Sequence, residues 1–437
     1  MKLLIINYLF PPAGGIGVQR ALSLAKYLPQ FGFEVHVLSA GNAGAAVYDP
    51  RLLEQVPPSV TLHRSFTPEL SFALQHKLWG MISPPGKTAA PAAPGKAGKS
   101  WKSSLATTIK NLFSPDPQVV WVPFAIRKAR QIIRQHGIEA VLVTVPPFST
   151  LLASNAIKRA FPHVKLITDF RDEWLSFYLN DFSFHTGDYN RRRSEQIERE
   201  TVELSDLVVA VTPTSLAEIR NRYPEVPDSR FACVHNGYDP EQFAAFQGRT
   251  HGSGKVVVTH MGTVYKTASP RFYLDALDVM PEAIRSRVET RFIGRVSDEE
   301  RRLLDGRKSD VRLLGFMSQA EALRRTEETD YLLLTMTNDI SLPGKLFEYL
   351  AMRKPILSLT PAHGEVARLL RETQAGWHAD AEDQHAVQSM IARAVEMAGA
   401  PGWFQPDSEA IRLYERKRLA EMYGSLIRGC ELRTASV

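Results

Sequence analysis

Cysteine is nearly absent from this chain, which has only Cys233 and Cys430 among 437 residues. Two cysteines provide no disulfide framework and no metal-binding pattern, so a reducing compartment is expected. Long apolar runs are absent too, since none reaches the roughly 18–20 residues that a membrane-spanning helix needs. Residues 1–7 are apolar but short and lead into prolines and glycines, which favours a strand and loop over a signal peptide. A cytoplasmic protein is therefore expected.

Two binding motifs are also missing. Gly15 and Gly17 follow the first predicted strand, but Arg20 stands where a dinucleotide-binding loop has its third glycine. Residues 38–40 end the second strand without the acidic residue that would hold a ribose, so NAD binding is disfavoured. No Asp-x-Asp occurs, so a divalent-metal clamp is not indicated. We expect no bound metal and no cofactor, and the net charge of +6 does not by itself imply a nucleic-acid partner.

Short apolar strands alternate with helices along the whole chain. Residues 2–8 predict a strand, 18–28 a helix and 34–39 a strand, which is how a parallel doubly wound sheet begins. Further strands are predicted at residues 140–145, 164–169, 207–212, 255–261, 288–293, 311–314, 331–335 and 355–359, and further helices at 148–161, 273–280, 319–327 and 345–352. The length exceeds one hydrophobic core. We therefore predict an α/β protein with two Rossmann-like, doubly wound domains, at residues 1–225 and 240–400.

Residues 82–102 depart from this alternation because they are rich in proline, glycine, alanine and lysine. Such a composition cannot bury enough apolar area to offset chain entropy, so an inserted mobile loop is predicted. Trp79 and Trp101 flank the insertion and either pack on the domain or, with the lysines, contact a membrane or lipid acceptor. The helix around Arg127 and Arg134 is also basic, and its charged face is either solvated or directed toward anionic lipid.

The loop after the first strand contains Gly14, Gly15 and Arg20. Its glycines let the backbone approach a ligand, and the helix start that follows offers unpaired N–H groups to an anion or a hydroxyl. We interpret the loop as part of an acceptor site, with an ordinary tight turn as the alternative.

Polar groups also follow the strand predicted at residues 164–169. Asp169, Arg171 and Asp172 stand at its carboxyl end, where open parallel sheets gather their catalytic groups. The carboxylates could bind sugar hydroxyls or take a proton. The alternative is an Asp–Arg pair that pins a loop.

The second domain has a turn that leads into a helix. Pro343 and Gly344 end the turn, Lys345 opens the helix, and Glu348 lies one turn further along the same face. A helix start with a lysine suits a diphosphate, and Glu348 is then placed to accept two hydroxyls of a ribose. The alternative is an ordinary helix start with a Lys–Glu surface pair.

Three residues near the ends of earlier strands extend this interpretation. Gly262 would let the chain pass close to a phosphate, and Lys266 and Arg295 could neutralise its charge. Either cation alone is more often solvated. Together with Lys345 at the same end of one sheet, they predict a diphosphate pocket.

Several segments, in order and spacing, resemble family 4 glycosyltransferases: residues 10–20, 117–124, 145–149, 169–174, 235–239 and 343–348. The resemblance covers nearly the whole chain except the insertion. It implies a GT-B fold, a nucleotide-sugar donor bound mainly by the second domain, and retaining transfer without a metal. It also implies that a final helix, within about residues 405–437, crosses back to complete the first domain.

The resemblance further implies roles for individual residues. Glu348 matches the glutamate that contacts the donor's ribose, while Lys266 and Arg295 match the cations that stabilise the departing diphosphate. Two positions differ from the family. Ile340 stands where the family's second glutamate lies, and residues 142–147 lack the usual histidine, so Asp172 or Arg171 is expected to orient the reacting groups.

The sequence therefore predicts a metal-independent glycosyltransferase that uses Asp172, Arg171, Lys266 and Glu348 in catalysis. Its expected partners are a nucleotide-sugar donor and a glycan or lipid-linked acceptor of cell-surface polysaccharide synthesis, with the inner membrane surface as a further contact. The alternatives are a sugar-nucleotide epimerase on the same scaffold and an inactive relative that only binds sugar nucleotides.

Overall fold

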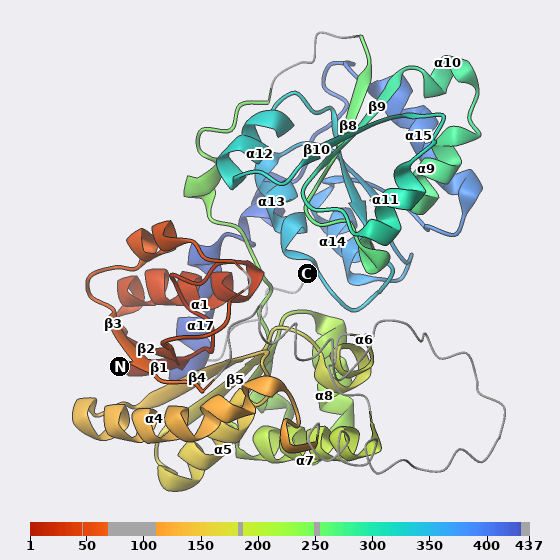
Figure 1. Cartoon of the computed structure of the whole chain (residues 1–437). Helices are drawn as coiled ribbons and strands as arrows, with labels where there is room; N and C mark the ends of the chain where they lie inside the picture. The colour runs from red at the N-terminus through yellow and green to blue at the C-terminus, as the bar shows by residue number, and fades with distance from the viewer. Residues whose placement is uncertain (46, 69–110, 182–186, 249–253, 430–437) are drawn as a thin grey trace, which may run out of the picture. The chain divides into compact units, whose positions relative to one another are not determined.

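The computed structural model describes residues 1–45, 47–68, 111–181, 187–248 and 254–429 (Figure 1). The insertion expected at residues 82–102, with its flanking tryptophans, lies outside the described residues. The chain divides into two compact units, Met1–Val234 with the chain from Ala420 onward, and His235–Leu419. The sequence interpretation gave residues 225 and 240 as the domain limits and assigned the chain from about residue 405 to the first domain. In the structure, the return to the first unit begins only at Ala420.

The first unit is built on a seven-stranded parallel sheet with the order β3-β2-β1-β4-β5-β6-β7. Its strands are β1 (Lys2–Ile6), β2 (Glu34–Ala40), β3 (Thr61–Ser65), β4 (Ala140–Val145), β5 (Lys165–Phe170), β6 (Leu207–Ala210) and β7 (Phe231–Cys233). Its helices are α1 (Ile16–Tyr27), α4 (Val122–His136), α5 (Thr150–Ala160), α6 (Leu179–Asp181), α7 (Asp188–Leu204), α8 (Pro213–Arg222) and most of α17 (Arg416–Arg428).

The central strands of this sheet are apolar along their whole length. Every residue of β4 is buried, as expected for a parallel strand that is covered on both faces. Helix α4 lies against β2 and β3, where its Ile132 and Ile133 join the same apolar core as Leu38 of β2. The helix ends at His136 because Gly137 takes the left-handed conformation, with φ of 64°. The end of α4 is thereby fixed close to the sheet.

The second unit is built on a six-stranded parallel sheet with the order β10-β9-β8-β11-β12-β13. Its strands are β8 (Val256–Met261), β9 (Val288–Ile293), β10 (Asp310–Gly315), β11 (Tyr331–Thr335), β12 (Ile356–Leu359) and β13 (Gly376–Ala379). Its helices are α9 (Arg271–Asp278), α10 (Glu282–Arg285), α11 (Asp298–Leu304), α12 (Gln319–Thr326), α13 (Gly344–Met352), α14 (Glu365–Thr373), α15 (Gln384–Met397) and α16 (Ser408–Arg412).

Each sheet reverses its strand order at one point. The reversal lies between β1 and β4 in the first unit and between β8 and β11 in the second. Ligands of open α/β sheets bind beyond the carboxyl ends of the strands at such a switch point. Ligand-binding sites are therefore expected in the loops after β1, β4 and β5, and in those after β8, β9 and β11. The prediction of two doubly wound α/β domains is confirmed.

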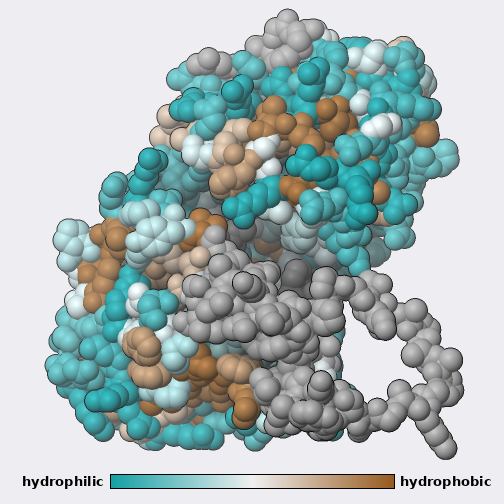
Figure 2. Space-filling model, viewed as in Figure 1, coloured by the Kyte–Doolittle hydropathy of each residue, from teal (hydrophilic) through white to brown (hydrophobic). Residues whose placement is uncertain are grey.

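The described surface is mainly hydrophilic in the view of Figure 2, with apolar residues gathered on the second unit near its edge strand β10. Leu313 and Leu314 of β10 are among the exposed large apolar residues. Among the described residues, none of the helices combines the length and the apolar character that crossing a membrane would require.

Candidate active site

The start of helix α13 is the centre of the candidate site in the second unit. Pro343 precedes the helix in an extended conformation, and no described side chain caps the helix or places an acid in its first turn. No described side chain therefore competes with an anion for its first N–H groups. Tyr349, in the middle of the helix, fixes α13 to the end of β8, because its hydroxyl accepts a hydrogen bond of 2.8 Å from the Met261 N–H.

Lys345 points from this helix start toward the end of β8. Its Nζ donates to Nε2 of His260 at 3.1 Å, while Nδ1 of His260 donates to the Leu333 carbonyl at 3.1 Å. The two bonds define the tautomer of the buried imidazole and hold the ammonium group in place. His260 is thus a positioning residue that the sequence interpretation missed, because it lies 85 residues from Lys345.

Two glycines let the backbone lie close to this ammonium group. A Cβ on Gly262 would stand 3.4 Å from Nζ of Lys345, and one on Gly294 would lie 2.2 Å from the Gly262 carbonyl oxygen. Both glycines have positive φ angles, 130° and 141°, that other residues rarely adopt. The loops after β8 and β9 can therefore run side by side next to Lys345.

Burial shifts the pKa values of Lys345 and Glu348 in opposite directions. Burial lowers the pKa of Lys345 to about 8, and the nearby Glu348 carboxylate counteracts part of this effect. Burial raises the pKa of Glu348, against the opposing influence of Arg416 and Lys345. Arg416 opens α17, and its Nε donates to the Gly237 carbonyl at 3.1 Å. The structure thus brings Gly262, Lys345 and Glu348 together and adds Arg416, which the sequence interpretation missed.

The other two predicted cations stand in loops at the same edge of the sheet, but their side chains are exposed. Lys266 opens a short 3₁₀ segment, and Thr267 beside it accepts a hydrogen bond of 3.1 Å from Thr337, just beyond the end of β11. The Arg295 guanidinium lies over the ring of Phe316, 4.9 Å from its centroid. The two residues therefore lie in the loops after β8 and β9, and the structure shows no hydrogen bond between either side chain and Lys345 among the described residues.

In the first unit, Arg20 and Asp169 form a buried pair. Arg20 donates from Nε and Nη2 to the Asp169 carboxylate at 2.9 Å, and from Nη2 to the Val234 carbonyl at 2.7 Å. The Tyr423 hydroxyl of α17 donates to Asp169 at 2.6 Å. The Asp169 side chain has no exposed area, and that of Arg20 is 7% exposed. For Asp169 the arrangement favours the alternative of an Asp–Arg pair that pins elements together, and its partner is Arg20, for which only a tight turn had been considered as the alternative.

Arg171 also has a bonding role within the first unit. Its guanidinium donates to the carbonyls of Val145, at 3.1 Å, and of Gly17 and Pro146. It thereby ties the end of β4 to the first turn of α1. Gly15, directly before α1, has a φ of 93° and open space beside it, and no described side chain caps this helix start. Gly14 is held by a hydrogen bond of 2.9 Å to Val47.

Asp172 keeps a carboxylate for which the described residues show no hydrogen bond or ion pair. Burial raises its pKa and Asp169 adds to this effect, while Arg171 opposes it.

A second acid lies nearby that sequence reasoning missed. Asp116 accepts hydrogen bonds from the Ser149 N–H at 2.9 Å and the Gln118 N–H at 3.2 Å, and burial raises its pKa to about 6. The sequence feature that could have identified Asp116 is its position directly before residues 117–124, one of the segments that resemble family 4 glycosyltransferases.

Tyr178 connects these two acids electrostatically. Burial, Asp116 and Asp172 together raise the pKa of its hydroxyl to about 12. The first unit therefore carries a protonated phenol close to two carboxyl groups of raised pKa, next to the loops that follow β4 and β5. Such a group can hold and exchange a proton with a sugar hydroxyl.

Comparison with known proteins shows which family and which folds this chain resembles. The family model for Glycosyltransferase Family 4 matches residues 88–242. The lipopolysaccharide outer core galactosyltransferase WaaB, in its apo form, has a similar structure, with 12% identity, a TM-score of 0.61, and coverage of 98% of this chain and 99% of that chain. No curated protein matches the sequence.

Two further solved structures are similar over the whole chain. WaaG, a glycosyltransferase involved in lipopolysaccharide biosynthesis, is 13% identical with a TM-score of 0.58, covering 98% of this chain and 100% of that one. The Anabaena protein Alr3699/HepE, in complex with UDP and glucose, is 14% identical with a TM-score of 0.55, covering 98% and 97%. At these identities the likeness concerns the fold, and it confirms the predicted GT-B architecture.

Proposed function

We propose that this chain, a family 4 glycosyltransferase with the GT-B fold, transfers a sugar with retention from a nucleotide-sugar donor to a glycan or lipid-linked acceptor of cell-surface polysaccharide synthesis. One observation carries the proposal. Lys345, Gly262 and the open start of α13 converge beyond the carboxyl ends of β8 and β11, at the switch point of the second sheet.

The donor half-site suits the charge that develops in this reaction. Breaking the bond between sugar and phosphate builds negative charge on the leaving diphosphate, which the Lys345 ammonium and the α13 N–H groups are placed to stabilise. We assign Lys266 and Arg295, both exposed in neighbouring loops, to the outer phosphate. Glu348 accepts the ribose hydroxyls, and hydrogen bonds from these hydroxyls would lower the raised pKa of the carboxylate, as Arg416 beside it already does in part.

The acceptor half-site is proposed around Asp172. Its carboxylate is available, and Arg171 holds the surrounding loops by binding three backbone carbonyls. Asp172 would orient an acceptor hydroxyl and take up its proton as the new glycosidic bond forms. Asp116 and Tyr178 would add two further groups that can carry a proton beside Asp172. This assignment replaces Asp169, whose carboxylate is fully buried.

A donor panel tests the proposed function. The protein is incubated with UDP-, GDP- and ADP-sugars and a membrane extract, and nucleotide release and labelled product are followed. Acceptor-dependent release with an unchanged anomeric configuration of the sugar is the expected result. Interconversion of the sugar without acceptor would instead indicate an epimerase, and donor binding without turnover an inactive relative.

Variants of Glu348 and Lys266 test the donor assignment. Glu348→Gln and Lys266→Ala are each expected to lower turnover by at least about tenfold, because each removes a group that acts on the ribose or the diphosphate. The matched controls are Glu396→Gln and Lys308→Ala, which change exposed residues of the same unit. Normal turnover by both test variants, with folding retained, would refute the assignment.

A pH profile follows from the pKa of Lys345. With that pKa lowered to about 8, the ammonium is charged below this pH and neutral above it. We expect kcat/KM for the donor to fall above pH 8 by about tenfold per pH unit, since kcat/KM reports ionisation of the free enzyme. The bound diphosphate raises the lysine's pKa, so kcat stays level to about pH 9. In Lys345→Arg the decline should disappear, and a decline that persists in this variant would contradict the assignment.

We also propose a peripheral location on the cytoplasmic face of the membrane, mediated by α4. Arg127, Arg130 and Arg134 are exposed at helical spacing, so they lie along one face of this helix. At its start, exposed Phe124 packs edge-to-face against exposed Phe66, with ring centroids 5.4 Å apart. A basic helix face next to exposed aromatic rings suits an anionic lipid surface.

Sedimentation with vesicles tests this location. The triple variant Arg127→Gln, Arg130→Gln, Arg134→Gln is expected to bind vesicles with anionic lipid about a hundredfold more weakly, at roughly 1 kcal/mol per arginine. The control variant replaces three exposed arginines of α7, Arg191, Arg192 and Arg199, by glutamine. Equal pelleting of the wild type and the α4 variant would remove the idea.

A further inference from the structure

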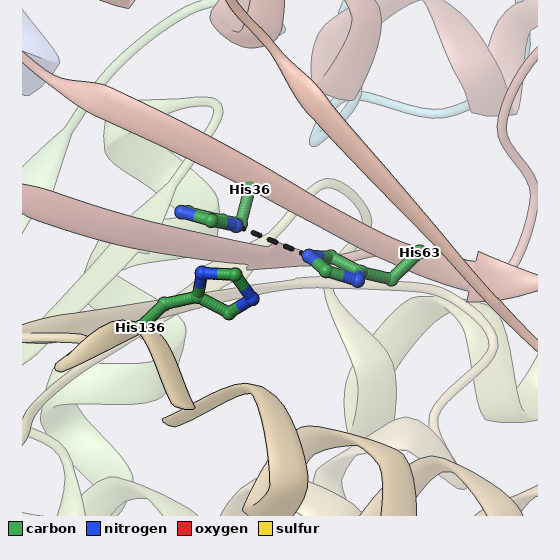
Figure 3. Close-up of side chains that lie close together, drawn as sticks. All are labelled: His36, His63 and His136. Carbon is green, nitrogen blue, oxygen red and sulfur yellow. Dashed lines mark hydrogen bonds between the residues drawn. The ribbon is translucent and has the colours of Figure 1, made fainter. Parts of the chain in front are cut away.

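Three histidines from separate elements meet on one face of the first unit's sheet (Figure 3). His63 of β3 stands opposite Leu38 of β2, so His36, two residues earlier on β2, points to the same face. His136 is the last residue of α4, the helix that lies against this face. Because each residue comes from a different element, the sequence contains no spacing signal for the cluster.

One ring nitrogen of each histidine lies close to those of the other two. Nδ1 of His36 lies 3.1 Å from Nε2 of His63, and one nitrogen of each histidine lies within 4.8 Å of those of the other two. A tetrahedral zinc ion with Zn–N bonds of about 2.0–2.1 Å holds its ligand nitrogens about 3.4 Å apart. The His36–His63 pair already approaches this spacing. His136 stands at a helix end and is only partly buried, so its side chain can adjust toward the other two.

The outer nitrogen of His36 has the partner that metal-binding histidines usually have. Nε2 of His36 lies 3.3 Å from a carboxylate oxygen of Glu34, which also pairs with Lys2 at 3.7 Å. When Nε2 donates to Glu34, Nδ1 keeps its lone pair directed toward the other two histidines. This arrangement selects the tautomer that can bind a metal through Nδ1.

Two of the imidazoles, those of His36 and His63, also sit in surroundings that favour the neutral, ligating form. Burial lowers the pKa of His36. Burial, the two neighbouring histidines and Lys128 lower the pKa of His63 to about 4. Neutral imidazole is a preferred ligand of Zn²⁺ and of other late first-row divalent ions.

We propose that His36, His63 and His136 bind one divalent transition-metal ion of the zinc class, with a fourth position left to water. The site is structural. It joins the edge strand β3 to the end of α4 just ahead of β4, whereas Asp172 and Arg171 follow the carboxyl end of β5. The ion would fix an edge strand, the element of a sheet with fewest hydrogen-bonded neighbours, and would hold the basic helix α4 against it.

Metal binding to tag-free, full-length protein tests the proposal. After treatment with a chelator, zinc is titrated by calorimetry, and cobalt is added to detect the visible absorption of a tetrahedral site. One ion per chain is expected, with a higher melting temperature for the zinc-bound protein. His63→Gln and His136→Gln should each weaken zinc binding at least about a hundredfold and abolish the thermal shift, and Glu34→Gln should weaken it about tenfold.

The control is His163→Gln, which changes an exposed histidine of the same unit and should leave binding intact. His63 and His136 are only partly buried, so their variants are informative even if replacing the buried His36 prevents folding. Circular dichroism verifies that each apo variant is folded. The proposal is overturned if the wild type binds no zinc saturably, or if the stoichiometry and affinity stay unchanged in both variants.

Discussion

Replacing Lys345 by alanine is expected to lower kcat/KM for the donor by about 10²–10³, the usual cost of removing one preorganised group that stabilises developing negative charge. The reason is the position of the ammonium group. It is held by His260, lies beside the glycine backbone after β8, and stands at the start of α13, where the helix adds its own positive end. Because charge on the diphosphate grows as the sugar leaves, kcat should fall as well as donor affinity.

A further variant of Lys345 tests whether the charge or the shape of this side chain matters, and a variant of a distant lysine is the control. Lys345→Arg keeps the charge, but the larger guanidinium must fit where a Cβ on Gly262 would already be 3.4 Å from the amine, so partial activity is expected. Lys308→Ala removes an exposed lysine of the same unit and should act like the wild type. Steady-state kinetics with a donor from the panel measures these values. Wild-type kcat/KM in Lys345→Ala would show that the diphosphate binds elsewhere.

The regular elements of this fold could be predicted because burial produces a strong sequence signal. Strands such as β4 and β11 are buried along their whole length and appear as continuous apolar runs. The edge strands β3, β7 and β13 were missed. Each is short and partly exposed, so its sequence shows neither a continuous apolar run nor a clear alternation. Their pairing depends on a neighbouring strand that the local sequence does not encode.

The candidate site was predictable only where its residues follow one another. Lys345 and Glu348 share a helix turn, so local spacing was enough to pair them. The contact of Lys345 with His260, the approach of Arg416 to Glu348 and the meeting of three histidines all join elements far apart in the chain. Sequence position also does not reveal depth. Asp169 and Asp172 both lie at the end of β5, yet one is fully buried and the other keeps a carboxylate for which the described residues show no partner.

The buried pair of Arg20 and Asp169 leads to the largest expected effect on stability. Arg20→Met removes every donor that the guanidinium directs to Asp169 and to the Val234 carbonyl, but leaves the aspartate in a site with no exposed area. Of the side chains that the structure describes, the Tyr423 hydroxyl alone would still donate to it. Removing one partner of a buried ion pair typically costs about 3–5 kcal/mol, because the remaining charge is uncompensated. We expect a loss of this size in the free energy of unfolding of the first unit.

The double variant Arg20→Met, Asp169→Asn distinguishes this cause from a general packing defect. A neutral amide can stay buried and still accept from Tyr423, so the double variant should recover about half or more of the lost stability. Urea unfolding of the full chain provides the measurement. Because each unit can unfold in its own transition, tryptophan fluorescence is compared with circular dichroism to assign the transition. Arg192→Met, at an exposed position of the same unit, is the control and should change stability by less than about 0.5 kcal/mol. Equal losses in the single and double variants would show that the arginine acts through its packing, with no contribution from the charge it neutralises.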